Sequence, residues 1–349
     1  MDRTKNEDYK SAVIVFLVAV ALLLAVSNLP AQWDIDLTIL AVLVLPPLLG
    51  YIVASGGFSV GTLAVILCFA VGVTLNSKLS ALLAAVSLPF AFTVGYVIRK
   101  KLRFRHSVMA SVAAALAGML LSIGALWLLT GQMPVDFIVG RLNSSFSSMA
   151  DSEVNGLYQM IRSADLITGA ITQSALNSTA RVDAVAYIMN QFKEVLNYNL
   201  VSMIGTYALL MGLVGYLILH AMRKRRRADV IAIPPFSEFT LPGRFWLAFL
   251  LSYLFGVIGE GLGWPGFDIL EVTVYSLYGL VLMVQGLSFL DFLYKRRHMS
   301  ITVRVVLHTL VLFISAIAAL IGSLLMWAGL FENMAGLRKR MDTKGGALL

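Results

Sequence analysis

Long apolar runs alternate with short polar or charged segments along most of the chain. A helix that crosses the hydrocarbon core of a bilayer needs about 20 mostly apolar residues. Runs near this length lie at Ser11–Leu29, Leu37–Ala54, Val60–Leu75, Leu79–Ile98, Ser107–Leu129, Val201–Met222, Phe245–Gly263, Ile269–Tyr294 and Ile301–Leu330. The pattern predicts an all-α fold, a polytopic transmembrane helix bundle with about nine spans, or eight if the last run does not cross.

Clusters of Lys and Arg directly follow three of these runs. They are Arg99–Lys101 with Arg103 and Arg105, Arg223–Arg227, and Lys295–Arg297. Lys and Arg close to a span are retained on the cytoplasmic side. An N-terminus in the cytoplasm satisfies all three clusters. We therefore expect a multi-pass protein of the bacterial cytoplasmic (inner) membrane with a cytoplasmic N-terminus.

The last apolar run, Ile301–Leu330, is longer than one untilted span requires. A single crossing would place the basic segment Arg338–Arg340 outside, against the charge rule, whereas a bent hairpin would return it to the cytoplasm. No Pro or Gly pair interrupts Val305–Ile321. The sequence therefore favours one long tilted helix, with the hairpin as the alternative.

Polar segments divide the chain into three regions. Residues 1–130 form a membrane region of five helices, 131–200 an outer insertion, and 201–349 a second membrane region with a cytoplasmic Pro-rich loop at 228–244. Apolar residues recur every three or four positions in Arg181–Asn197, which predicts an amphipathic helix on the outer surface. Asn143–Ser152 is rich in Ser and Asn and is predicted to be a loop.

Composition supports the membrane assignment and excludes several classes of function. Hydrophobic residues make up 59% of the chain and charged residues 13%, against about 25% charged in soluble domains. The net charge of +8 lies mostly at span ends, which indicates orientation and contact with anionic lipid, not nucleic-acid binding. The single cysteine, Cys68, excludes an internal disulfide and leaves no thiolate metal site. No metal or other cofactor is expected.

Gly57-Phe58-Ser59-Val60-Gly61 matches the nucleophile-elbow pattern of hydrolases. That motif needs a strand-to-helix turn and a nearby histidine base, but these residues join two apolar helices. A tight turn between helices is the better interpretation, and we expect no enzymatic activity.

Candidate ligand-binding residues lie in the two apolar runs after the Pro-rich loop. Glu260 and Glu271 flank the predicted outer turn, and Gln285 lies deeper. Ionisable groups inside a membrane mark functional sites by default, so these three residues are candidates for binding a solute from the outer side. The alternatives are that the two acids reach water at span ends and that Gln285 bonds to a neighbouring helix. Asp291 and Lys295 are spaced to pair on one helix face.

Small side chains recur where helix backbones could approach closely. They are Ala21 and Ala25 in the first run, Ala110, Ala114 and Gly118 in the fifth, and Gly256 with Gly259 in the seventh. They could pack helices within the chain or against a partner.

Four stretches, in order along the chain, resemble the YybS-like family of uncharacterised bacterial multi-pass membrane proteins. They are Leu45–Gly50, Pro234–Pro242, Val284–Arg297 and Gly329–Arg340. That family is distantly similar to the substrate-binding S components of energy-coupling factor transporters. The resemblance implies capture of a small molecule, with a separate coupling subunit and ATPases as partners, and it places Ala21 and Ala25 against the coupling subunit.

Two hypotheses follow. In the first, the protein binds or transports a small solute or lipid from the outer side, with Glu260, Glu271 and Gln285 lining the mouth and Arg181–Asn197 covering it. In the second, it is a non-transporting scaffold that recruits partner proteins through the Pro-rich segment. A polar pocket around Gln285 would favour the first, and tight packing there the second.

Overall fold

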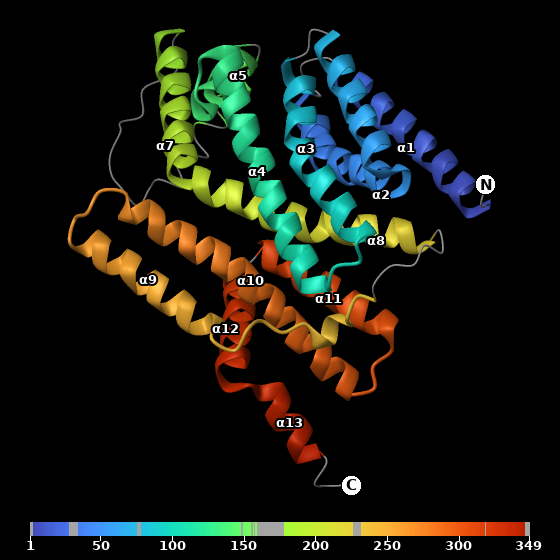
Figure 1. Cartoon of the computed structure of the whole chain (residues 1–349). Helices are drawn as coiled ribbons and strands as arrows, with labels where there is room; N and C mark the ends of the chain where they lie inside the picture. The colour runs from blue at the N-terminus through green and yellow to red at the C-terminus, as the bar shows by residue number, and fades with distance from the viewer. Residues whose placement is uncertain are drawn as a thin grey trace. The chain divides into compact units, whose positions relative to one another are not determined.

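The structure is a computed structural model, and it describes residues 3–27, 34–74, 78–147, 149–154, 156, 158, 178–225, 232–317 and 319–345. Within these ranges every regular element is a helix (Figure 1). The main helices are α1 (Arg3–Ser27), α2 (Asp34–Thr74), α3 (Lys78–Arg99), α4 (Phe104–Thr130), α5 (Pro134–Ser147), α7 (Ser178–Leu210), η2 (Met211–Gly215), α8 (Tyr216–Arg225), α9 (Phe245–Gly261), α10 (Phe267–Arg296), α11 (Ile301–Ile317), α12 (Ala319–Ala335) and α13 (Leu337–Gly345).

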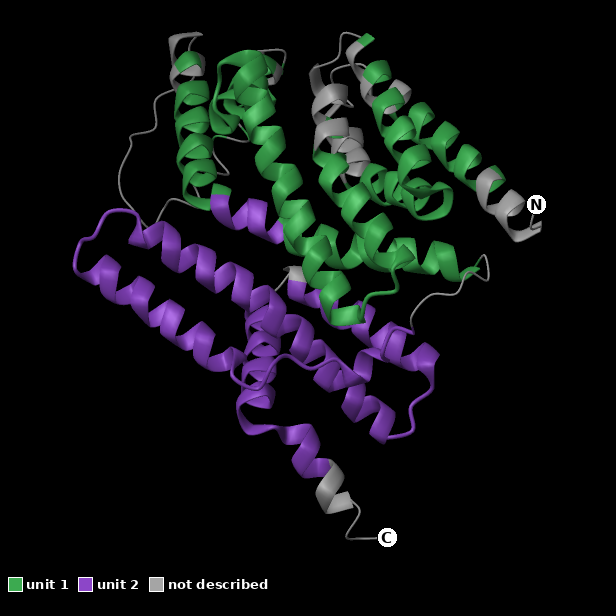
Figure 2. Ribbon diagram, in the orientation of Figure 1, with its two compact units in different colours: residues 1–200, 207–231 green, residues 201–206, 232–349 purple. Residues whose placement is uncertain are grey.

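The helices form two compact units (Figure 2). Unit 1 comprises Met1–Leu200 and Tyr207–Ile231, and unit 2 comprises Val201–Thr206 and Ala232–Leu349. The first membrane region and the insertion expected from sequence thus belong to one unit. The second unit contains the Pro-rich segment and every helix after it.

In unit 1, α2 contains both the second and third apolar runs and is broken between them at Gly57, where φ is +87° and ψ is 176°. The two arms then fold back on each other: a Cβ added at Gly61 would lie 2.8 Å from the Cα of Val53. In a straight helix these residues would be more than two turns apart. The tight turn predicted at Gly57–Gly61 is therefore present.

α7, η2 and α8 continue one into the next, with one π-helical segment at Met211–Gly215. The backbone of Gly212 packs on that of α4, because an added Cβ would lie 2.5 Å from the Cα of Val112. The amphipathic helix predicted at Arg181–Asn197 lies within α7, and its Ile188 and Met189 are buried. The loop predicted at Asn143–Ser152 is partly wrong, because α5 continues to Ser147 and buries Phe146 against α7.

In unit 2, α12 packs along α10 at backbone distance. A Cβ on Gly286 would lie 2.1 Å from the carbonyl oxygen of Leu325, and one on Gly329 would lie 2.0 Å from that of Leu282. Farther along, Met326 approaches Gly279. Met326 meets Gly279, Gly329 meets Leu282 and Glu332 meets Gln285, so residue numbers increase together on the two helices and α12 runs parallel to α10.

The single long helix favoured for Ile301–Leu330 is wrong. The run forms two helices of 17 residues each, α11 and α12. Arg304 and His308 on α11 contact Asp291 and the carbonyl of Leu287, near the C-terminal end of α10. Since α12 runs parallel to α10 and ends at that same end, α11 and α12 form the hairpin that was the alternative. The contacts with α10 override the absence of a Pro or Gly break.

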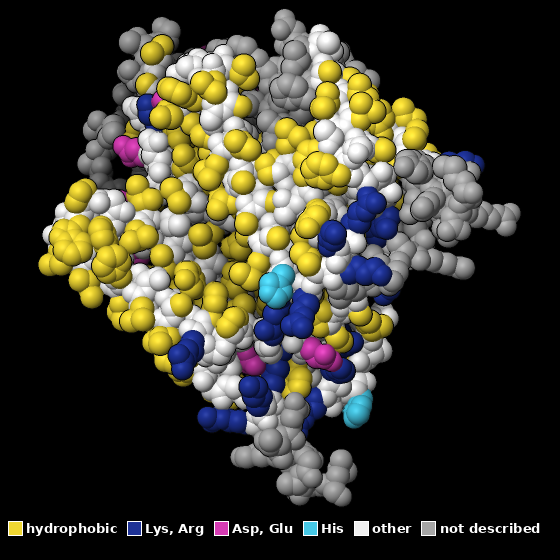
Figure 3. Space-filling model, in the orientation of Figure 1, with side chains coloured by type: hydrophobic (Ala, Val, Ile, Leu, Met, Phe, Trp, Pro, Cys, Tyr) yellow, Lys and Arg dark blue, Asp and Glu magenta, His cyan; other side chains and the backbone are white. Residues whose placement is uncertain are grey.

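Large apolar side chains are exposed on many of the helices, and they cover much of the face in Figure 3. On α9, Leu251, Phe255 and Ile258 are each more than half exposed, as are Val305 and Phe313 on α11. Such continuous apolar surface fits lipid, not water. In the described part of the chain, four stretches are long and apolar enough to cross a membrane: Leu43–Leu67, Phe104–Thr130, Ala184–Arg225 and Phe267–Arg296. Five shorter apolar helices accompany them.

Candidate functional site

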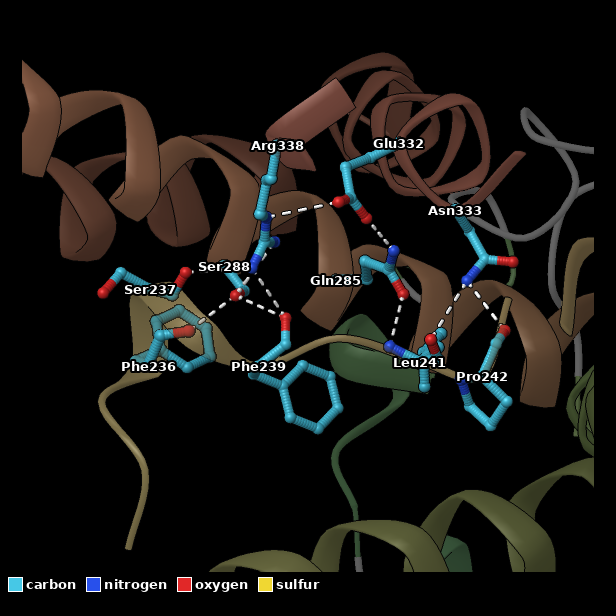
Figure 4. A network of polar contacts seen from close by, with 10 residues as sticks. All are labelled: Phe236, Ser237, Phe239, Leu241, Pro242, Gln285, Ser288, Glu332, Asn333 and Arg338. Atoms are coloured by element: carbon cyan, nitrogen blue, oxygen red, sulfur yellow. Dashed lines mark hydrogen bonds and ion pairs between the residues drawn. The ribbon is translucent and has the colours of Figure 1, made fainter. Parts of the chain in front are cut away.

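The Pro-rich segment Ala232–Pro242, here called the strap, runs across unit 2 with little regular structure. Its one helical turn is the 3-10 turn Phe236–Glu238, preceded by Pro235 at φ −54° and ψ 144° and followed by extended Phe239. Within the strap, the N–H groups of Glu238 and Phe239 donate to the carbonyls of Pro235 and Phe236. Proline has no N–H to donate, and irregular backbone gives the other carbonyls no regular partner within the segment. These other carbonyl groups therefore need donors from elsewhere, and side chains of α10, α12 and α13 provide them (Figure 4).

Arg338 on α13 makes the largest contribution. Its Nη1 donates to the carbonyls of Ser237 and Phe239, both at 2.9 Å, and its Nη2 donates to the hydroxyl of Ser288 at 3.1 Å. Its Nε lies 3.3 Å from a carboxylate oxygen of Glu332. Arg338 is 6% exposed and Glu332 is 4% exposed, so this is a buried ion pair.

The guanidinium group of Arg338 remains charged in this environment. Burial lowers its pKa, while the nearby carboxylates of Glu332 and Asp291 raise it. Its carbon also lies 5.9 Å and 5.8 Å from the ring centres of Phe289 and Phe292. Those aromatic faces stabilise a cation, and the carbonyl acceptors suit its fixed fork of donors.

Arg338 reaches the strap because the chain turns sharply between α12 and α13. Gly336 has φ of +58°, and its N–H donates to the carbonyl of Glu332 at 2.9 Å. This is a glycine helix terminus in the left-handed conformation, which residues with a Cβ rarely adopt. The turn allows Arg338 to fold back to Glu332.

Gln285 and Asn333 hold the second half of the strap. The Oε1 of Gln285 accepts from the N–H of Leu241 at 3.0 Å, and its Nε2 donates to Glu332. Asn333 donates through Nδ2 to the carbonyl of Pro242 at 3.0 Å. Gln285 is 1% exposed. Both the oxygen and the nitrogen of its amide group therefore make hydrogen bonds within the protein.

A second ion pair lies beside this network. Arg304 contacts both carboxylate oxygens of Asp291 at 3.1 Å, joining α11 to α10. The local pairing expected between Asp291 and Lys295 is not observed; Lys295 instead lies 3.6 Å from Glu238 of the strap. The ring of His308 packs edge-on to Phe236. The strap is thus contacted from α10, α11, α12 and α13.

The structure does not bring the three candidate ligand residues together. Glu260 is exposed at the end of α9, and its carboxyl interacts with that of Glu271 at the start of α10. Gln285 lies about four helical turns, or about 21 Å, farther along α10. Its contacts are those of the strap, so it does not share a mouth with the two acids.

The small residues of α1 have different outcomes. Ala21 is exposed, whereas the side chain of Ala25 lies outside the described residues. Among the described side chains, no group of three His, Cys, Asp or Glu could hold a metal ion.

Sequence reasoning identified only one member of the network. It selected Gln285 for its depth but assigned Arg338 to a surface charge cluster and gave Glu332, Asn333 and Ser288 no role. A signal was available, because Glu332-Asn333 interrupts the end of an apolar run and Arg338 follows within two turns.

No curated protein and no solved structure matches the chain. One family model does match, and it covers residues 16–327, which is most of the sequence. The apolar helices, their exposed hydrophobic side chains and this match agree. The chain belongs to the family described as predicted membrane protein (DUF2232).

Proposed function

We propose that the protein is a membrane scaffold that presents the strap, Ala232–Pro242, as a fixed docking surface for a soluble cytoplasmic protein. The observation that carries this proposal is the buried polar network beneath the strap. Gln285, the residue selected for solute binding, is packed and hydrogen-bonded to the strap. No catalytic step is assigned to the chain.

The network beneath the strap buries charged groups, which is costly. Removing an ion pair from water costs several kcal/mol per ion, so a buried pair is weak support for stability and is often retained for conformational specificity. Here Arg338, Glu332, Gln285, Ser288 and Asn333 all serve one segment. We infer that these five residues together hold the strap in one conformation.

Several side chains of the strap are exposed on the surface of unit 2. Pro234, Pro235 and Glu238 are exposed, and Phe236 is 43% exposed. Ser237 between them is buried. A rigid, exposed Pro-Pro-Phe segment loses little conformational entropy when it binds, which favours recognition by a partner protein.

The charge rule supports a cytoplasmic strap. In unit 2, Lys295 pairs with the strap residue Glu238 and Arg338 binds the strap directly. The third basic cluster, Lys295–Arg297, and a fourth, the basic segment Arg338–Arg340, therefore lie at the same end. In unit 1, Arg99 lies against Gly57 and Arg223 donates to Ser55. With a cytoplasmic N-terminus and α11–α12 as a hairpin, all four clusters obey the rule. The proposed location is the bacterial inner membrane.

Site-specific photo-crosslinking in cells tests the proposal. Phe236 is replaced by benzoylphenylalanine, which keeps an aromatic ring at the exposed position. We expect a discrete adduct with one soluble protein. The matched control carries the same amino acid at Phe255, which is 55% exposed on α9 and is expected to face lipid.

Releasing the strap should weaken the adduct. In an Arg338→Met background, crosslinking from position 236 should fall, while membrane insertion and expression are followed separately. If position 236 gives no protein adduct beyond that of position 255, the docking function is wrong. An adduct that Arg338→Met leaves unchanged would show that a fixed strap is not required.

A groove in unit 1 supports a second candidate function, the binding of a small solute or lipid. A groove of about 620 Å³ lies between α5 and α7, with Val139, Phe146, Val185 and Met189 among its apolar lining and Asp136 in its lining, paired to Lys193 at 2.9 Å. This volume lies in the range of small-molecule sites. It supports binding of a small solute or lipid from the outer side, as for an S component with a coupling subunit at Ala21 and a partner ATPase.

Native mass spectrometry of the purified protein tests this candidate. A Val185→Trp variant would fill the groove, whereas Val195→Trp adds the same ring at an exposed position of α7. A co-purified small molecule should be lost from the first variant and kept by the second. Equal retention in both would exclude the groove.

A further inference from the structure

The turn that breaks α2 lies in unit 1, and the strap lies in unit 2. At this turn the chain reads Ser55-Gly56-Gly57-Phe58-Ser59. Gly57 has φ of +87°, and the arm that follows it begins a new helical stretch. The first N–H groups of such a stretch carry partial positive charge and favour anions. By itself this feature would not define a site.

Two arginines from other helices converge on this turn. Arg223 at the end of α8 donates through Nη1 to the hydroxyl of Ser55 at 3.2 Å. The guanidinium of Arg99, at the end of α3, lies so close over Gly57 that an added Cβ would be 2.5 Å from its Nη1. The two guanidinium groups thus contact residues only two positions apart in the same turn.

This arrangement differs from that of arginines that only extend to the bilayer surface. Gly57 is buried under Arg99, and Arg223 is partly buried with its head group directed to the turn. The turn needs a residue without a Cβ for this contact. Lys100 and Lys101 follow Arg99 directly in sequence and increase the positive potential.

We propose that Arg99, Arg223, Ser55 and the Gly56–Gly57 turn form a binding site for a phosphate group. Guanidinium forks bind phosphate oxygens with paired donors, and a hydroxyl adds another donor. The phosphate could belong to a phospholipid head group or to a soluble phosphorylated molecule, and the chemistry of recognition is the same. Neither the strap nor the α5–α7 groove contributes to this site.

Thermal unfolding of the full-length protein in neutral detergent tests the site. The probes are phosphatidic acid, diacylglycerol with the same acyl chains, and inorganic phosphate. A ligand that binds only the folded state raises the unfolding midpoint. We expect phosphatidic acid to raise it and diacylglycerol, which lacks the phosphate, to leave it unchanged. A rise with inorganic phosphate as well would indicate a soluble ligand, and a rise with phosphatidic acid alone a lipid head group.

Two variants assign the response to the site. Arg99→Gln removes an exposed side chain, so the protein should fold, and the concentration of phosphatidic acid for half of the shift should rise about tenfold. Arg223→Gln should act in the same direction. Arg105→Gln, an exposed arginine that begins α4, is the matched control and should respond like the wild type. An equal loss in Arg105→Gln, an unchanged response in Arg99→Gln, or no shift with any probe would overturn the proposal.

Discussion

Replacing Arg338 by Met keeps a flexible, unbranched side chain but removes the charge and every donor that Arg338 directs at the strap. Glu332, 4% exposed, would lose its cationic partner, and the carbonyls of Ser237 and Phe239 would each lose a donor. Removing one partner of a buried ion pair costs about 3–5 kcal/mol. The lost hydrogen bonds belong to the same network, so we include them in that figure and expect a destabilisation of about 3–5 kcal/mol.

The assay is unfolding of purified protein in detergent, with a double-mutant cycle. Glu332→Gln alone should also destabilise, because it leaves Arg338 buried without its counter-ion. The double variant should lose less than the sum of the single variants, with a coupling energy above about 1 kcal/mol. Arg297→Met is the control, since Arg297 is exposed and surface substitutions usually change stability by within about 0.5 kcal/mol.

Either of two results would contradict this expectation. If Arg338→Met cost no more than Arg297→Met, the ion pair would not fix the strap. If the two single variants were strictly additive, Arg338 and Glu332 would not act as a pair. Proteolysis within the strap gives a second measurement, because release should increase cleavage there in Arg338→Met but not in the control.

Three further outcomes are expected. Gly329→Ala should destabilise by about 1–3 kcal/mol in detergent unfolding because its Cβ would meet the carbonyl of Leu282, whereas Gly124→Ala, with open space around it, should be neutral or slightly stabilising. Gly336→Ala should cost about 1–2 kcal/mol, since φ of +58° strains a residue with a Cβ; an unchanged midpoint would contradict the turn. In a background without the native cysteine, an impermeant maleimide added to spheroplasts should label a cysteine at Trp264 but not one at Arg340, and labelling of both would contradict the hairpin.

The positions of the helices could be read from the apolar runs, because their length is set by the backbone rise and by the thickness of the bilayer. The path of the last apolar run, Ile301–Leu330, could not be read in this way. No Pro or Gly pair within Val305–Ile321 marks a break, and the hairpin is determined by contacts with α10, at Asp291 and Leu287 for α11 and at Gly286 for α12. Such contacts join residues far apart in the sequence, so the local pattern of apolar and polar residues does not reveal them.

The candidate site was only partly predictable for a similar reason. Depth in an apolar run singled out Gln285, and the alternative given for it, a bond to a neighbouring helix, is present as its contact with Glu332. That partner lies 47 positions away in the sequence. Arg338 looked like one more cation in a cytoplasmic cluster, and only the turn at Gly336 gives it a buried position.

The contact between Arg338 and Ser237 spans 101 positions of sequence. During synthesis the strap therefore emerges long before the guanidinium that will hold it. Domains are made from the N-terminus at about 5–20 residues per second, so α9, α10, α11 and α12 must all be completed before Arg338 can donate to the carbonyls of Ser237 and Phe239. The closing of the strap is thus a late event in biogenesis, and it can occur only in chains that have been translated as far as α13.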